Sequence, residues 1–152
     1  MLWIATGPAV VMVMMIAVAI HNQENRRRLS RKYYEGIFRR MLEKAHAGFV
    51  RLPDFAPDAT HVWQIKTVEQ RISMVRDASV QLGPFITDEA YGTRLAEFTL
   101  ATDELLGAID FLLIVIAKMS SSDDRLQAAK NAIGKKGEVR RVAGELLLQL
   151  GR

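Results

Sequence analysis

The sequence predicts an all-α protein in which a single N-terminal transmembrane helix is followed by a cytoplasmic helical bundle built on a long antiparallel helical hairpin. Three observations lead to this fold class. Residues 2–20 carry no charged side chain, the remaining chain repeats apolar residues at spacings of three and four, and the whole chain holds only four prolines. Such spacings are typical of helices, which proline interrupts. We expect a transmembrane anchor over residues 1–21, a basic juxtamembrane helix over 22–51 and the bundle over 52–152.

The anchor is predicted from the apolar run Leu2–Ile20. As a helix rising ~1.5 Å per residue the run is about 28 Å long, close to the ~30 Å hydrocarbon core of a bilayer. A cleaved signal peptide is the alternative, because Ala17-Val18-Ala19 mimics a cleavage site. A signal peptide would also begin with a cationic segment, and here none precedes the apolar run. We therefore expect a retained signal anchor.

Positive charge follows the apolar run closely, and Lys and Arg in short flanks stay cytoplasmic. The body of the protein is therefore predicted to be cytoplasmic, with the bacterial inner membrane as the expected location. These cations are also candidate ligands for anionic lipid headgroups. The alternative is that they only determine topology. They are Arg26, Arg27, Arg28, Arg31 and Lys32.

The net charge of +4 is unevenly distributed along the chain. Residues 21–51 carry nine Lys/Arg and three Asp/Glu (net +6), residues 52–124 carry five and twelve (net −7), and residues 125–152 carry seven and two (net +5). We expect the basic segments to lie against the acidic one or to face an anionic membrane surface. Nucleic-acid binders are more uniformly basic, so no nucleic-acid partner is predicted.

The juxtamembrane helix is expected from about Glu24 to Val50, either separate from the anchor or continuous with it. Apolar residues spaced by four predict its packed face. Pro53 and Pro57 then interrupt the helix. The predicted face consists of Leu29, Tyr33, Ile37, Met41, Ala45 and Phe49.

Four helices are predicted in the bundle, over residues 59–82, 88–119, 123–133 and 138–150. The first two carry coiled-coil seams and are joined by a short turn at Gly83-Pro84, which predicts the antiparallel hairpin. Gly134 is expected to end the third helix. One seam consists of Ile65, Val68, Ile72, Val75, Ser79 and Leu82. The other consists of Tyr91, Leu95, Phe98, Thr102, Leu105, Ile109, Leu112, Ile116 and Met119.

The stretch Leu105–Ala117 is apolar on every side except at Asp110. Thirteen residues are short for a membrane span, so a buried core helix is predicted, with a partner interface and a second membrane segment as alternatives. Asp110 is expected at a solvent-exposed edge, because an unpaired buried charge is costly. The candidate packing or partner residues are Leu105, Ile109, Leu112 and Ile116.

Catalytic signatures are missing from the sequence. Glu43 and His46 have the E-x-x-H spacing that recurs in pairs in di-metal helical bundles. Here the nearest second copy, Asp58 and His61, lies at a helix start and not within a helix, so the motif is weak evidence. The chain has no cysteine, which excludes thiolate metal sites and cysteine nucleophiles. No glycine-rich phosphate-binding motif is present either. We therefore expect no enzyme activity, no metal and no cofactor.

These observations predict an accessory, scaffold or adaptor subunit at the cytoplasmic membrane surface. Its expected partners are the membrane and another protein, or further copies of the same chain. Two alternatives remain open at this stage. One is a self-assembling, pore-forming protein that uses Leu105–Ala117, and the other is a metal-binding bundle enzyme that uses Glu43 and His46.

Overall fold

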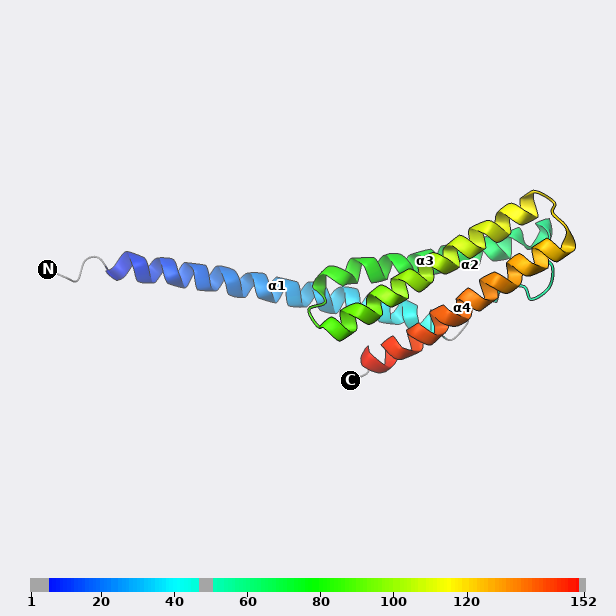
Figure 1. The fold of residues 1–152 in the computed structure, drawn as a ribbon. Helices are drawn as coiled ribbons and strands as arrows, with labels where there is room; N and C mark the ends of the chain where they lie inside the picture. The colour runs from blue at the N-terminus through cyan, green and yellow to red at the C-terminus, as the bar shows by residue number, and fades with distance from the viewer. Residues whose placement is uncertain (1–5, 47–50, 151–152) are drawn as a thin grey trace.

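The computed structural model describes residues 6–46 and 51–150, and their regular structure is entirely helical, which confirms the all-α class (Figure 1). Side chains are described from residue 10 onward, except at residue 45. The helices are α1 (Thr6–His46), the 3-10 helix η1 (Ala59–His61), α2 (Val62–Leu82), the 3-10 helix η2 (Gly83–Phe85), α3 (Glu89–Ala117) and α4 (Ser122–Leu150).

The C-terminal part of α1 joins the other three long helices in an up-down-up-down bundle. α1 packs against α2 and α4, and α3 packs against the same two helices, so neighbours in the chain are neighbours in space. α2 and α3 form the predicted antiparallel hairpin, with η2 at its turn. Figure 1 shows that the N-terminal part of α1 projects from the bundle as a single helix. The helix is uninterrupted between these two parts.

Burial confirms both predicted seams almost completely. All six seam residues of α2, from Ile65 to Leu82, are buried, as are those of α3 from Tyr91 to Ile116. Met119 is the exception, because α3 has ended before it. Its φ of 51° is in the left-handed region and its side chain is 90% exposed. Asp110 is exposed, as predicted.

The predicted packed face of α1 is only partly right. Ile37 and Met41 are half-buried and pack against the core, but Leu29 and Tyr33 are 67% and 65% exposed, and the fully buried residues are Phe38 and Leu42. A series spaced only by four drifts by about 40° per step around a helix of ~3.6 residues per turn, so its N-terminal members turn away from the bundle. The actual face is short and is centred on Phe38. Phe49 and the side chain of Ala45 are outside the described residues.

An extended segment continues where α1 stops. α1 ends at His46, and residues 51–58 then run beside the distal half of the bundle, the half remote from the projecting helix. Leu52, Pro53 and Pro57 are buried there. The side chain of Gln64 donates a hydrogen bond to the carbonyl of Arg51 (3.2 Å), and Arg125 donates one to the carbonyl of Pro57 (3.0 Å). The segment therefore covers core that a longer α1 would have covered.

The predicted break between the last two helices is also wrong, because α4 runs without interruption from Ser122 to Leu150. Gly134 and Gly137 are helical and exposed. A glycine in a helix costs about 1 kcal/mol relative to alanine. The buried face of α4 continues on both sides of the glycines, and its packing on α3 outweighs that cost. This face consists of Ala128, Ala129, Ala132, Val139, Val142, Ala143 and Leu146.

Within the described residues, no helix is both long enough and apolar enough to cross a membrane. The structure therefore does not support the transmembrane part of the predicted fold class. The predicted span Leu2–Ile20 lies partly outside the described residues.

Replacement of the α4 glycines tests the continuity of this helix. A Cβ added at Gly134 or Gly137 meets no atom within 4 Å. We expect Gly134→Ala and Gly137→Ala each to stabilise the full chain by about 0.5–1 kcal/mol in urea unfolding, because alanine is the better helix former. Gly144→Ala is the matched control, since its Cβ would lie 3.1 Å from His46 Nε2 and should bring no gain. Destabilisation by Gly134→Ala would instead indicate the left-handed helix end predicted from the sequence.

Candidate functional site

The projecting part of α1 exposes an unbroken apolar surface, here called the stem (Val10–Ile20). It contains no polar side chain. Its large side chains are 50% to 68% exposed although every one is aliphatic or methionine. The stem spans about three helical turns, so these side chains point in all directions around the axis. A helix that is apolar all round requires an apolar environment or partner chains to cover it.

Polar residues follow the stem within the same helix. His21 and Asn25 share a hydrogen bond of 3.1 Å, and the predicted basic residues come next. Arg31 is half-buried and pairs with Glu35 at 3.6 Å. The remaining four, Arg26, Arg27, Arg28 and Lys32, are exposed. Because the helix is continuous, Arg27 lies about 10 Å along the axis beyond Ile20.

Three of the predicted cations meet the α2–α3 turn in a pocket at the proximal end of the bundle, the end nearest the stem. Sequence analysis did not connect this turn with the basic residues. The ring of Phe85 stacks on that of Tyr34, with centroids 5.2 Å apart, and this contact holds the turn against α1. The pocket, here called the proximal pocket, is lined by Arg27, Arg28, Arg31, Pro84, Phe85 and Thr87.

The predicted packing residues of α3 lie inside the bundle. Leu105, Ile109 and Leu112 are fully buried, and Ile116 is 5% exposed. Their neighbours in the core come from α2 and α4. In this structure they pack the chain against itself and form no part of its surface.

A second apolar surface lies at the distal end of the bundle, and sequence analysis missed it. Two features of the sequence could have indicated it. Trp63 lies off the α2 seam, and the stretch Leu105–Ala117 is apolar on so many sides that α2 and α4 together cannot cover all of its side chains. Val62, Ile114 and Met119 line a common pocket, and the ring of Phe55 packs on that of His61 at 4.8 Å. The term distal apolar surface is used here for the five exposed apolar side chains of this end, of which Phe111 and Ile114 share one pocket and Ile114 and Met119 another. They are Phe55 (49% exposed), Trp63 (80%), Phe111 (55%), Ile114 (49%) and Met119 (90%).

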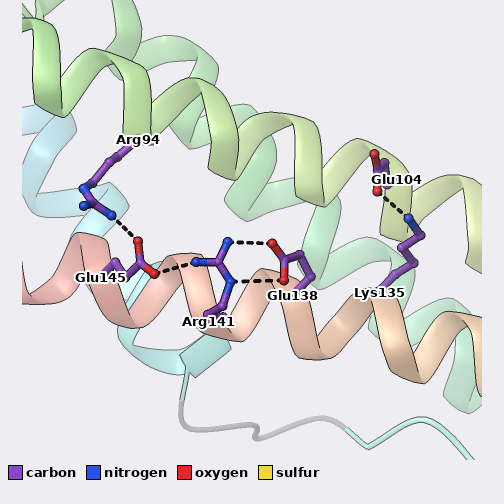
Figure 2. Close-up of polar contacts among 6 residues, drawn as sticks. All are labelled: Arg94, Glu104, Lys135, Glu138, Arg141 and Glu145. Carbon is purple, nitrogen blue, oxygen red and sulfur yellow. Dashed lines mark hydrogen bonds and ion pairs between the residues drawn. The ribbon is translucent and has the colours of Figure 1, made fainter.

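Ion pairs join α3 and α4 along one side of the bundle (Figure 2). Arg94 reaches from α3 to Glu145 on α4, and Lys135 on α4 reaches back to Glu104 at 2.6 Å. Arg141 contacts both Glu145 (2.5 Å) and Glu138 (2.6 Å). These side chains are roughly one third to one half exposed, so solvent screens the pairs and each contributes little to stability. We infer that the pairs between the two helices hold α3 and α4 in register.

Within this cluster, hydrogen bonds from Arg141 lower the pKa of the Glu138 carboxyl and its positive charge adds to the effect. The guanidinium binds in bidentate fashion, with Nε donating to Oε2 (3.1 Å) and Nη2 to Oε1 (2.6 Å). Because the folded-state pKa lies below the unfolded one, the stabilisation by this pair is complete above the unfolded pKa. It is lost as the pH falls through the folded pKa.

Neither E-x-x-H-like motif forms a metal site. Glu43 accepts a hydrogen bond from Arg39 (3.2 Å), and the ring of His46 lies beside Gly144 of α4. Asp58 and His61 form the capping box of η1, with Asp58 Oδ1 2.9 Å from His61 Nδ1. In the described parts of the chain, no group of three or more His, Asp or Glu side chains is arranged to hold a metal ion.

The chain was compared with protein-family models, with curated proteins and with solved structures. The chain matches no protein-family model, no curated protein and no solved structure.

The bidentate pair can be tested by titration. We expect Arg141→Gln to raise the pKa of Glu138 toward its ordinary value, as followed by ¹³C NMR of the side-chain carboxyl, because the substitution removes the donors and the charge. Asp58 is an internal control, since hydrogen bonds from Thr60 hold its pKa low and do not involve Arg141. An unchanged Glu138 titration would show that the pair does not persist in solution.

Proposed function

We propose that this chain is a single-pass membrane-anchored protein whose bundle acts as an accessory, scaffold or adaptor subunit at the cytoplasmic membrane surface. The observation that carries this proposal is the stem. Eleven consecutive apolar residues, Val10–Ile20, are exposed on a helix that leaves the bundle. In the sequence the uncharged run extends upstream to Leu2, and nineteen residues would span about 28 Å if all were helical.

Transfer of this run into lipid is favourable. Each Leu, Ile, Phe or Val at the centre of a membrane helix contributes about −0.3 to −0.6 kcal/mol to insertion. The stem supplies six valines and isoleucines, together with three methionines. The backbone of α1 is already helical, so its polar groups need no water along the stem. A lipid environment therefore fits both the side chains and the backbone.

The basic residues after the stem support the orientation of the proposed anchor. Five cations lie between Arg26 and Lys32, on the side of the stem that leads into the bundle. Under the positive-inside rule this side is cytoplasmic. The proximal end of the bundle would then face the membrane, and the distal apolar surface would face the cytoplasm.

Protein contacts are proposed for the distal apolar surface. Trp63 and Phe55 are aromatic and exposed, and aromatic side chains dominate the energetically important centres of protein interfaces. α3 has 29 residues, so this surface lies roughly 30–40 Å from the proximal end. Lipid would not reach it at that distance. A partner protein is therefore the proposed occupant.

The two rival functions fit less well. A pore built from Leu105–Ala117 would require core residues such as Ile109 and Leu112 to leave the bundle, and both are fully buried. A metal enzyme would require Glu43 and His46 to share a site, and each contacts a different neighbour in this structure.

Charged substitutions in the stem test the anchor. We expect Val13→Arg/Ile16→Arg to release the full chain from membranes during alkaline carbonate extraction, because an arginine at a helix centre costs about 2.5–3.5 kcal/mol for insertion. Asn22→Arg/Gln23→Arg is the matched control, which adds the same charge to α1 beyond the stem and should remain membrane-bound. Carbonate release of the unmodified protein would refute the anchor.

Protease accessibility tests the orientation of the anchor. A C-terminal tag should resist protease in intact spheroplasts and be digested after lysis.

Site-specific cross-linking tests the distal apolar surface. A photoreactive phenylalanine analogue in place of Trp63 in the full chain should give a discrete adduct with another protein in native membranes. The same analogue at Gln81 is the control, because Gln81 is exposed on α2 but lies near the proximal end. Equal adducts at both positions would contradict a defined contact surface. An adduct that contains only a second copy of this chain would replace the adaptor by a self-assembling protein.

A further inference from the structure

The packed face of α1 continues beyond the bundle, toward the stem, as a row of arginines. Tyr34, Phe38 and Leu42 form its buried or half-buried part. At about 100° per residue, Arg27 and Arg31 project within roughly 20° of the centre of this face. Arg28 lies at the edge of the same side. The positions that would contact the hairpin, if the hairpin were longer, are therefore occupied by cations.

The α2–α3 turn closes the other side of these arginines. Pro84, Phe85 and Thr87 line the proximal pocket opposite α1, and stacking of Phe85 on Tyr34 fixes their position. The next residue, Asp88, does not line the pocket; its carboxylate accepts a hydrogen bond from the backbone of Tyr91 (2.7 Å) as the N-cap of α3. Two elements distant in sequence thus form one cationic recess.

The arginines of this recess are largely available to an anion. Arg31 has only a long contact with Glu35, at 3.6 Å. Among the described residues, Arg27 and Arg28 have no carboxylate at ion-pair distance. Planar guanidinium groups bind phosphate oxygens in bidentate fashion, and a threonine hydroxyl can add a hydrogen bond. The chemistry of the lining therefore fits a phosphate group.

From this geometry we propose that the proximal pocket binds the headgroup of an anionic phospholipid. The inference rests on the proposed membrane anchor, which places Arg27 about 10 Å beyond the end of the stem at Ile20. The headgroup layer extends about 5–7 Å beyond the hydrocarbon core on each side, so Arg27 lies just above it. Its side chain leans toward the N-terminus of the helix and reaches back to the phosphates. An anionic headgroup is favoured over a zwitterionic one because its net negative charge complements the three arginines, whereas the net charge of a zwitterionic headgroup is zero.

Arg26 and Lys32 provide a control matched in charge and depth. Both are exposed on the same two turns of α1 but do not line the pocket. They lie roughly 120° from the centre of the packed face, on opposite sides. A general attraction between cations and an anionic surface would weaken equally when either pair is replaced. A defined pocket would respond only to the pair that lines it.

The experiment uses the full chain in nanodiscs that contain equal amounts of phosphatidylglycerol and phosphatidylcholine. Native mass spectrometry then counts the lipids of each class that the protein retains. We expect a preference for phosphatidylglycerol that falls at least about tenfold in Arg27→Gln/Arg31→Gln and less than about threefold in Arg26→Gln/Lys32→Gln. Equal losses in the two variants would overturn the pocket and leave diffuse charge.

Two further arms keep the test decisive. Thr87→Val changes the wall of the pocket opposite α1 without altering its charge. An unchanged preference of this variant for phosphatidylglycerol would overturn a two-sided pocket, even if Arg27→Gln/Arg31→Gln failed to fold. Displacement of the retained lipid by millimolar inorganic phosphate would overturn the lipid assignment in favour of a soluble phosphate compound. Carbonate extraction of the unmodified protein, read separately, shows whether the anchor itself has failed.

Discussion

The packing of one short face of α1 against the α2–α3 hairpin determines how the rest of the molecule is arranged. Phe38 and Phe98 meet edge to face with centroids 5.5 Å apart, and Tyr34 stacks on Phe85 one turn nearer the stem. These contacts fasten a helix of 41 residues to the bundle by its C-terminal part. The next two turns toward the stem reach only the α2–α3 turn, at the proximal pocket, and the rest of α1 extends beyond the bundle.

The same attachment explains the asymmetry of the bundle. Because α1 ends at His46, the distal half of the core is covered on that side by the extended segment around Leu52 and Pro57. An extended segment covers less surface than a helix with side chains on all sides. Phe111 and Ile114 lie on α3, which packs on α2 and α4 as α1 does, and both are about half exposed. Ile114 lines pockets on both the α2 and the α4 side of α3, so it points outward from the bundle.

The sequence allowed good prediction of the parts of the fold that depend on local periodicity. The seams of α2 and α3 alternate three and four, and from Ile65 to Ile116 they are buried as expected. The prediction for α1 went wrong at Leu29 and Tyr33, because a series spaced only by four drifts around the helix. The predicted break in α4 was wrong because packing on α3 outweighed two glycines. The proximal pocket and the distal apolar surface were beyond such reasoning, since each depends on which distant elements meet, as Phe85 meets Tyr34.

The connection between stem and bundle is stiff. Residues 21–33 contain no glycine and no proline, and sharp helix kinks arise mainly at those residues. These three to four turns of α1 therefore transmit the orientation of the stem directly to Tyr34 and the bundle. If the stem is anchored as proposed, the bundle cannot swing freely like a domain on a flexible linker. Its basic end stays at the headgroups, and its aromatic end is presented at a constant height above the membrane, which is the geometry a scaffold requires.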